Sequence, residues 1–205
     1  MKVIAFLSQK GGAGKTTLAV HTAVVAHEAG QRVVVIDTDP QKSATVWGEA
    51  RQHAAPIVAT ADVSELKRVL EAARDEGMSL AIVDAAPHAA PSAASIARAA
   101  DLVAIPCRPT AFDLAAVAGA VSIVRAAGTK AAFILSACPF RAPEIEETRD
   151  ALRGYGLPIA PLGITDRRAF SRAVATGRAV TEFEEDGKAA GEIRALWSWL
   201  WEQAE

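Results

Sequence analysis

Short apolar runs alternate with segments of helical periodicity along the whole chain. Most of these runs are apolar at every position, which is typical of strands in a parallel sheet that has helices on both faces. The predicted strands are Val3–Leu7, Arg32–Ile36, Pro56–Thr60, Leu80–Val83, Leu102–Pro106, Ala131–Ser136 and Ile159–Leu162. The pattern therefore predicts an α/β fold with a mostly parallel sheet.

The segments between the strands carry apolar residues at helical spacing. The predicted helices are Lys15–Ala29, Ser43–His53, Asp62–Glu76, Ser92–Ala100, Phe112–Ala127, Pro143–Tyr155, Asp166–Thr176 and Lys188–Gln203. Asp62-Val-Ser-Glu65 has the spacing of a capping box at the start of the third helix. Because no repeat or linker interrupts the rhythm, we expect residues 1–205 to form one doubly wound α/β domain with helices on both faces of the sheet.

The loop after the first strand, Lys10-Gly-Gly-Ala-Gly-Lys-Thr-Thr17, has the composition of a phosphate-binding loop. In such a loop, backbone N–H groups converge on an oxyanion at a helix N-terminus, and glycines allow the close approach. Lys15 offers a positive charge to the terminal phosphates of ATP, and Thr16 offers a hydroxyl to Mg²⁺. The first glycine of the usual pattern G-x-x-x-x-G-K-[ST] is replaced by Gln9, and Lys10 follows it.

Acidic residues follow two other predicted strands, at the sheet edge where α/β proteins gather their functional groups. Asp37 and Asp39 end one strand, with a spacing that lets both side chains address one site. Beside a nucleotide, one of them is suited to orient Mg²⁺ and the other to position the attacking water. Asp84 ends the run Leu80–Val83, as the aspartate of a Walker B strand does. The alternative for Asp37 and Asp39 is a helix cap or a solvated turn.

A proline-rich stretch, Ala104–Asp113, leaves the fifth predicted strand. Pro106 and Pro109 stiffen the backbone at the sheet edge where a nucleotide or a facing subunit is expected. We predict Pro106 as a nucleotide contact, and the alternative is an ordinary connection between strand and helix. His88 has no cysteine or carboxylate at metal-ligand spacing, so no chemical role is predicted for it.

Composition limits the classes of function. Apolar residues make up 51% and charged residues 22% of the 205 positions, which is ordinary for a globular protein long enough for a sizeable core. With a net charge of −2, any binding to nucleic acid must come from a local patch. No apolar run approaches the length of a membrane span, and we expect a cytoplasmic protein without a signal peptide. Cys107 and Cys138 are far apart in the sequence and are predicted to be buried thiols.

The loop and the acidic segments together resemble the deviant Walker A ATPases, and in particular the short ParA-type partition proteins that lack an N-terminal DNA-binding domain. Lys10–Thr17 is similar to the K-G-G-x-G-K-[ST]-[ST] loop of that family. Asp37-Thr-Asp-Pro-Gln41, followed by Lys42-Ser-Ala-Thr45, is similar to its D-x-D-P-Q-x-S-x-T segment. The resemblance runs from Lys2 to the final helix and implies a P-loop NTPase fold of the deviant Walker A type.

The resemblance also implies a role for each matching residue. Lys10 would cross into the ATP of a second subunit in a sandwich homodimer, Lys15 would hold the β- and γ-phosphates, and Asp39 would position the hydrolytic water. These three residues are the predicted catalytic set. Magnesium is implied to be held or supported by Thr16, Asp37 and Asp84. The residues predicted to bind the nucleotide are Gly11, Gly12, Ala13, Gly14, Lys15, Thr16, Thr17 and Pro106.

A basic segment near the C-terminus bears on DNA binding. Four arginines and one aspartate lie between residues 164 and 180, which gives the segment a local charge of +3. Arg168 and Arg172 are four positions apart and share one face of the predicted helix. In the resembled family this region binds DNA without sequence preference, so DNA contacts are predicted for Arg167, Arg168, Arg172 and Arg178. The alternative is a solvated amphipathic helix.

The function implied by the resemblance is that of an Mg²⁺-dependent ATPase that positions a cargo on the nucleoid. The ATP homodimer would bind DNA non-specifically, and a ParB-like or cargo-adaptor protein would stimulate hydrolysis. The motifs do not distinguish a plasmid, a chromosome region and a large protein assembly as the cargo.

Two alternative classes share the glycine loop. A MinD-like ATPase, which regulates division-site placement, would insert the apolar stripe of its last helix into a membrane surface. The stripe here consists of Ile193, Leu196, Trp197, Leu200 and Trp201. Because Glu202 and Glu205 follow it and repel anionic lipid, we favour docking of this helix on the domain and expect no membrane partner. A nitrogenase-like iron protein would need a cysteine just after Asp84, where the chain has Ala85-Ala-Pro87.

Overall fold

The computed structural model describes residues 1–87 and 90–205, and His88 therefore lies outside the described residues. Within these two ranges, six parallel strands form one sheet in the order β3-β2-β4-β1-β5-β6. The strands are β1 (Lys2–Phe6), β2 (Val33–Asp37), β3 (Ile57–Thr60), β4 (Leu80–Asp84), β5 (Leu102–Cys107) and β6 (Lys130–Leu135). The predicted doubly wound parallel sheet is confirmed.

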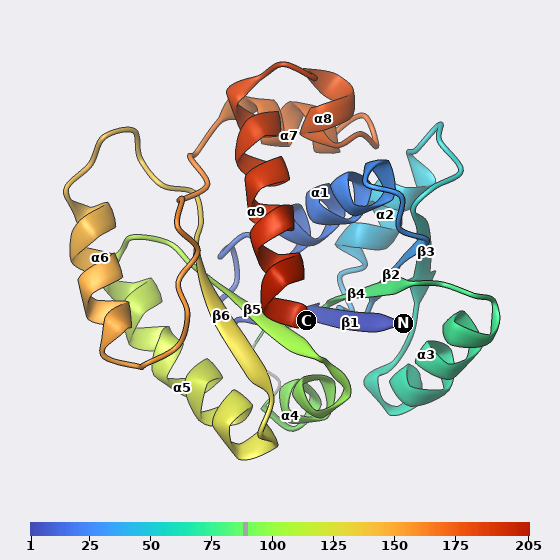
Figure 1. Cartoon of the computed structure of the whole chain (residues 1–205), viewed down its shortest axis with the longest axis horizontal. Coiled ribbons are helices and arrows are strands. Elements are labelled where there is room, and N and C mark those ends of the chain that lie inside the picture. The colour runs from blue at the N-terminus through green and yellow to red at the C-terminus, as the bar shows by residue number, and fades with distance from the viewer. Residues whose placement is uncertain (88–89) are drawn as a thin grey trace.

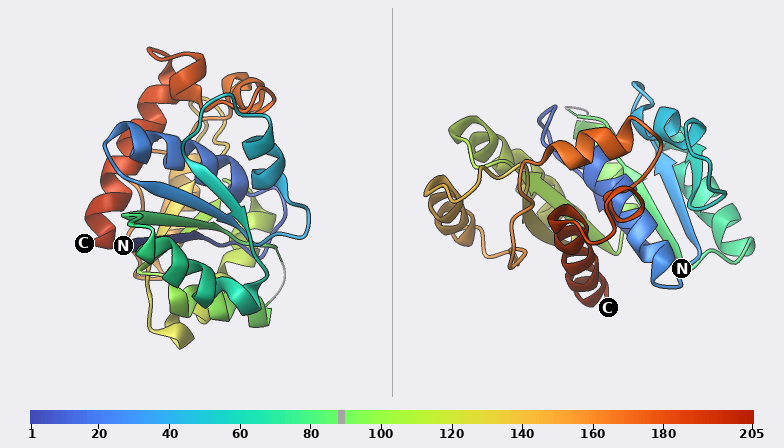
Figure 2. Two further views of the ribbon diagram at one scale, coloured as in Figure 1. Left: turned by 90° about the vertical axis from the view of Figure 1, so that its right-hand side faces the viewer. Right: turned by 90° about the horizontal axis from the view of Figure 1, so that it is seen from above.

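Helices cover both faces of the sheet (Figure 1). On one face lie α1 (Lys15–Glu28) and α9 (Lys188–Ala204), with α7 (Arg168–Val174) and α8 (Val180–Phe183) above them. On the other face lie α3 (Leu66–Asp75), α4 (Ala90–Ala99) and α5 (Ala111–Ala127). The remaining two helices are α2 (Ser43–Glu49), beside β2 and β3, and α6 (Glu144–Arg153), beside α5 and β6. Figure 2 shows the two-sided arrangement from two further directions.

Successive residues of a strand enter cores on opposite faces of the sheet. Ile4 and Phe6 of β1 pack in the core that contains α1 and α9, whereas Val3 and Ala5 pack in the core that contains α3. Both faces therefore need apolar side chains, which explains why the strands are apolar at every position.

The C-terminal helix packs on the domain. In α9, the side chains of Ile193, Leu196, Trp197 and Leu200 are buried, and Trp201 is partly buried against the same core. Docking of this helix is therefore confirmed. In the described part of the chain, no helix is both long and apolar enough to cross a bilayer.

The predicted strand Ile159–Leu162 is absent from the sheet of the described residues. Ile159 forms only an isolated parallel bridge with Phe133. Pro158 and Pro161 flank this position, and because proline has no N–H group the segment cannot complete a ladder of hydrogen bonds.

The capping box predicted at Asp62 is also wrong. The Asp62 side chain makes no capping hydrogen bond, and a short 3₁₀ turn, Val63–Glu65, precedes α3. The Glu65 N–H donates to the Asp62 carbonyl at 2.9 Å, so a backbone turn starts this segment. In addition, the second helix ends at Glu49 instead of His53, and the four-residue α8 was not predicted.

Candidate nucleotide-binding site

Strand pairing brings the glycine loop and the acidic residues to one edge of the sheet. Asp84 at the end of β4 lies opposite Phe6 of β1 on one side and opposite Asp37 of β2 on the other. The loop leaves β1 and enters α1 at Lys15. The predicted loop, Asp37 and Asp84 therefore share one site.

The loop has the backbone geometry of an anion-binding turn. Gly12 and Gly14 have φ angles of +77° and +90°, in the left-handed region that favours glycine. A Cβ added to Gly11 or Gly12 would meet nothing within 4 Å, so the space beside the loop is open. Gly14 caps α1 without a side chain, which leaves the first N–H groups of the helix free to bind an anion.

Lys15 is buried at the start of α1. Its ammonium donates a hydrogen bond to the Lys10 carbonyl at 3.2 Å. Burial lowers the pKa of Lys15, while the nearby Asp84 and Asp39 act to raise it. A buried ammonium next to carboxylates and a glycine loop is well placed to bind the phosphates of a nucleotide.

Asp84 is fully buried, and neither of its carboxylate oxygens has a hydrogen-bond partner within residues 1–87 and 90–205. Burial raises the pKa of Asp84 to about 7; the nearby Thr16 hydroxyl and Lys15 oppose this shift, and Asp37 adds to it. A buried carboxylate without partners is costly unless another group neutralises it. The two carboxylate oxygens of Asp84, next to the Thr16 hydroxyl, fit a hard cation such as Mg²⁺.

Asp37 is also buried, but its carboxylate is occupied. One oxygen accepts the Asp39 N–H at 3.0 Å, and the other accepts the N–H and the hydroxyl of Thr45 at 2.9 Å each. Asp37 therefore binds the first turn of α2 at Thr45, although the N-cap of that helix is Lys42. Its support for Mg²⁺ stays a prediction. Asp39 is only partly buried and accepts the Gln41 N–H at 2.9 Å.

The donor set for a metal is incomplete without a nucleotide. Across the described residues, no three His, Cys, Asp or Glu side chains gather into a metal-binding cluster. Magnesium commonly takes one or two protein ligands and completes its shell with substrate phosphates and water. Asp84 with Thr16 is such a partial set, so the residues present fit a magnesium–nucleotide complex.

A cavity of about 580 Å³ opens beside the loop, within the size range of small-molecule sites. Ile164, Phe170 and Val174 give it an apolar wall. Arg108, which follows β5, lines it as well, and its Nε atom is buried without a partner in the described part of the chain. The cavity can hold the base and ribose of a nucleotide whose phosphates lie on the loop.

Pro106 does not line this cavity. It lies buried within β5, opposite Ile134 of β6, and Arg108 is the residue of the proline-rich stretch that reaches the cavity. The contribution of residues 164–175 was missed because their position depends on a long-range bridge. That bridge joins Cys138 to Thr165 and has no local sequence signal.

Lys10 is held by its own chain. Its ammonium pairs with Asp113 in the first turn of α5 and lies 5.8 Å from the centre of the Phe112 ring. The Lys10 side chain remains 36% exposed. The residue therefore sits at the surface next to the nucleotide site.

The four predicted DNA-binding arginines differ in their surroundings. Arg168, Arg172 and Arg178 are exposed. Arg167 instead pairs with Glu192 of α9 at 2.7 Å. The local charge of +3 between residues 164 and 180 therefore overstates the positive charge of this surface. Glu192, which lies outside that segment in α9, neutralises one of its arginines.

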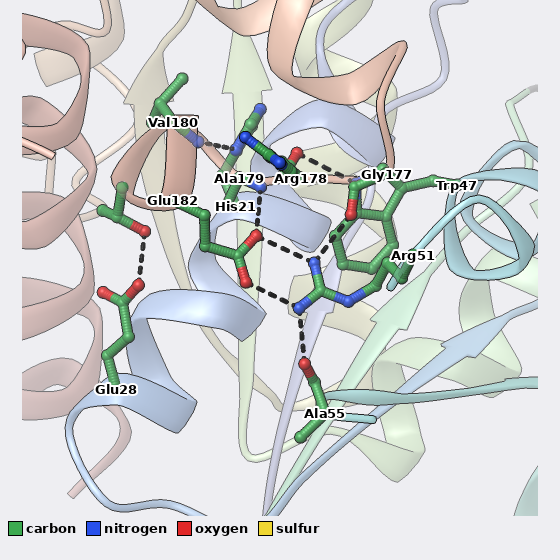
Figure 3. A network of polar contacts seen from close by, with 11 residues as sticks. His21, Glu28, Trp47, Arg51, Ala55, Gly177, Arg178, Ala179, Val180 and Glu182 are labelled. Atoms are coloured by element: carbon green, nitrogen blue, oxygen red, sulfur yellow. Dashed lines mark hydrogen bonds and ion pairs between the residues drawn. The ribbon is translucent and has the colours of Figure 1, made fainter. Parts of the chain in front are cut away.

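A buried polar network joins α2 to the segment that carries Arg178 (Figure 3). Arg51, whose side chain is 2% exposed, binds both carboxylate oxygens of Glu182 at 2.8 and 3.0 Å. It also donates to the Gly177 carbonyl at 2.9 Å and stacks on the Trp47 ring at 4.6 Å. Trp47 donates to the Arg178 carbonyl at 3.1 Å. The helix that follows Asp37 is thus fixed to the basic segment.

Fold and loop define a P-loop nucleotide-binding protein with a parallel α/β sheet. Residues 4–180 match the family model of the CobQ/CobB/MinD/ParA nucleotide binding domain. The chain belongs to this family, which includes the ParA and MinD nucleotide-binding ATPases.

Individual relatives agree with this assignment. The chain is 34% identical to the maintenance of carboxysome distribution protein A of Gloeobacter kilaueensis, over 95% of this chain and 89% of the relative. It is 29% identical to protein ParA of Rhizobium radiobacter, over 83% and 81% of the two chains. The solved structure of apo McdA from Cyanothece matches with a TM-score of 0.80 over the full length of both chains. At 16% identity, this likeness shows the fold.

Proposed function

We propose that the chain is an ATP-dependent positioning ATPase of the ParA type. It binds ATP with Mg²⁺, forms an ATP sandwich homodimer, binds DNA non-specifically and hydrolyses ATP when a partner protein stimulates it. The observation that supports the proposal most directly is the buried Asp84 beside an open glycine loop, since neither of its carboxylate oxygens has a hydrogen-bond partner in the described residues. This pairing supports a site completed by a magnesium–nucleotide complex.

Each residue of the site has a distinct role in this proposal. The loop N–H groups and Lys15 hold the phosphates, while Thr16 and Asp84 hold Mg²⁺. When bound, Mg²⁺ neutralises charge on the phosphate oxygens. Asp39 is partly exposed at the same edge, so its carboxylate can accept a hydrogen bond from the attacking water.

Lys10 gives the site its dependence on a second subunit. An ammonium aimed at the γ-phosphate of a facing ATP stabilises the pair of subunits only while that charge is present. The same charge stabilises the transition state, as an arginine finger does. Dimerisation and hydrolysis are therefore linked through one residue.

DNA binding in this proposal rests on the exposed arginines of α7 and the loop that follows it. Arginines bind the phosphate backbone without reading sequence, with a Kd of roughly 10⁻⁴ to 10⁻⁶ M and a strong dependence on salt. A dimer presents two such patches and gains by avidity. Weak binding that depends on dimerisation suits an ATPase that cycles on and off the nucleoid.

The named relatives support distribution of a cargo as the biological role. One relative is named for carboxysome distribution and another is named ParA. We propose that a ParB-like or cargo-adaptor protein links this chain to its DNA or protein cargo, in the cytoplasm on the nucleoid. The apolar stripe of α9 is packed in the core. It is therefore not available for insertion into a membrane surface, which a MinD-like role would need.

The DNA patch is tested with Arg168→Glu combined with Arg172→Glu. In gel shifts with ATP at low salt, we expect at least a tenfold weaker affinity for DNA, because two phosphate contacts become repulsive. Arg68→Glu combined with Arg74→Glu on α3 makes the same change in net charge on the opposite face and serves as the control. Equal affinity of the α7 variant and the wild type would reject the patch. A wild type that binds no DNA in any nucleotide state would reject the positioning role.

A further inference from the structure

Arg108 brings a positive charge to the wall of the nucleotide cavity. It lines the cavity together with Gly12, Gly14 and Thr17 of the phosphate-binding loop. Asp166 lines the same cavity, yet across residues 1–87 and 90–205 no ion pair joins Arg108 to an acid. Within the described residues, the charge of Arg108 is therefore not neutralised by a direct contact.

The guanidinium of Arg108 also carries a buried donor. Its Nε atom is buried and has no hydrogen-bond partner in the described part of the chain. Such a donor is costly, because it has lost its hydrogen bonds to water without gaining an acceptor. Phosphate oxygens match the fork of N–H groups on a guanidinium and accept from two of them at once. A phosphate at this wall of the cavity would thus satisfy both the Nε atom and the charge.

Hydrogen bonds fix the backbone around Arg108 to the loop. The Ser136 N–H donates to the Cys107 carbonyl at 2.9 Å. The buried hydroxyl of the same Ser136 donates to the Ala13 carbonyl of the loop at 2.8 Å. Directly after Arg108 the chain turns, because the Thr110 N–H donates to the Arg108 carbonyl at 2.8 Å. The end of β5 is therefore held in place beside the loop, and Arg108 starts from a fixed position.

The charges near the loop favour a second cation for the phosphates. Lys15 is already close to the carboxylate of Asp84. The other lysine of the loop, Lys10, is paired with Asp113. A bound nucleotide adds several negative charges to this edge of the sheet, so a further positive charge at the cavity wall stabilises the complex. Arg108 supplies that charge from an element outside the loop.

The lining of the cavity indicates which phosphate Arg108 reaches. Gly14 and Thr17 share the cavity with Arg108, whereas Lys15 and Asp84 are not among its lining residues. In the proposed function, Lys15 and Asp84 serve the terminal phosphates and Mg²⁺, and the cavity holds the base and ribose. The phosphate on the cavity side of the loop is then the α-phosphate, which is attached to the ribose.

We propose that Arg108 is a nucleotide-binding residue whose guanidinium holds the α-phosphate. The inference rests on the nucleotide site of the proposed function and needs neither the dimer nor DNA. ATP and ADP share this phosphate, so Arg108 contributes to the binding of both. Lys15 acts on the terminal phosphates, where the two nucleotides differ.

The test compares Arg108→Gln with the wild type in calorimetric titrations with ADP and Mg²⁺, which involve no hydrolysis. We expect the affinity for ADP to be about tenfold weaker in the variant, as for the loss of one charge-assisted hydrogen bond. Arg98→Gln is the matched control. Arg98 is exposed on α4 and lines a cavity with Lys2 and Lys130, the first residues of β1 and β6, at the opposite edge of the sheet. This control should bind ADP as the wild type does.

ADP with one sulfur on the α-phosphate locates the contact. Its two diastereomers present either an oxygen or a sulfur to a given donor, and sulfur is the weaker acceptor. The wild type should therefore distinguish the diastereomers several-fold, and Arg108→Gln should distinguish them much less. Arg108→Lys, which keeps the charge without the fork, should recover part of the affinity for ADP. Equal affinity for ADP in Arg108→Gln and the wild type, or an unchanged preference between the diastereomers, would overturn the inference.

The wild-type chain gives a reading that needs no variant to fold. Mg²⁺ and ADP should slow the reaction of Arg108 with phenylglyoxal several-fold, as followed by mass spectrometry, and should leave the reaction of Arg98 unchanged. Equal reaction of Arg108 with and without ADP would contradict the contact. If ADP protects Arg108 but the wild type forms no ATP-dependent dimer, the positioning function fails and the assignment of Arg108 stands. A wild type that binds no ADP would reject both.

Discussion

Lys15 and Asp84 are charged residues held where burial disfavours their charge. Burial lowers the pKa of Lys15 and raises that of Asp84 to about 7. Asp37 lies beside them with both oxygens already bonded, and its contacts stabilise α2. Asp37 therefore stabilises the fold, whereas both carboxylate oxygens of Asp84 are buried without a hydrogen-bond partner in the described residues.

His21 on α1 gives a prediction about pH. Its ring is buried and accepts the Val180 N–H at 3.1 Å, and burial lowers its pKa to about 3, while Glu182 acts in the opposite direction. Because this pKa lies below the ordinary 6.5, the folded state binds fewer protons than the unfolded state between pH 3 and 6.5. The stability from neutral His21 is therefore present above pH 6.5 and is lost as the pH falls.

At pH 5 this loss should be about 2 kcal/mol of the free energy of unfolding. Urea unfolding at pH 7 and pH 5 measures this loss in the wild type and in His21→Gln. Glutamine does not titrate, so the difference between the two proteins is the contribution of His21. The wild type should lose more stability than the variant. An equal loss in both proteins would show that His21 does not titrate as the structure implies.

At the scale of elements, the sequence predicted what depends on local pattern. Continuous apolar runs located all the strands of the described sheet, and glycine and aspartate at strand ends located the loop, Asp37 and Asp84. Features that depend on long-range contacts could not be predicted from the sequence. The pairing of Arg167 with Glu192 and the approach of Arg108 to the cavity both depend on residues far away in the chain. The strand predicted at Ile159–Leu162 is wrong because the prediction followed the apolar residues there and did not give enough weight to the two prolines.

The link between α2 and α8 yields a prediction about stability. Arg51→Ala should lower the free energy of unfolding by about 3–5 kcal/mol, because it leaves the carboxylate of Glu182 without its buried partner. Urea unfolding measures this change. Arg68→Ala is the control, since its ion pair with Glu65 is exposed and should be worth less than about 1 kcal/mol. Similar losses in the two variants would mean that the network in Figure 3 does not hold these elements together.

At the scale of the whole molecule, the nucleotide site and the basic surface are neighbours. Arg167 and Arg168 line the cavity beside the loop. They also line a second cavity with Arg172 and Lys188, to which Asp166 and Glu184 contribute acids. A change at the nucleotide therefore occurs next to the proposed DNA contacts. Figure 1 shows the elements concerned, α7 and α8, above α1. The overall charge of −2 is compatible with the proposed DNA binding, which is weak and depends on dimerisation.

In the proposed function, ATP joins two copies of the chain through Lys10. Asp39→Ala should bind ATP but hydrolyse it slowly, because the attacking water loses its positioning carboxylate. In sedimentation equilibrium, Asp39→Ala should be a dimer with ATP and Mg²⁺ and a monomer with ADP. Adding Lys10→Ala to this variant should return it to a monomer with ATP. If Asp39→Ala stays monomeric with ATP, or if its dimer persists after Lys10→Ala is added, ATP does not join two copies of the chain through Lys10.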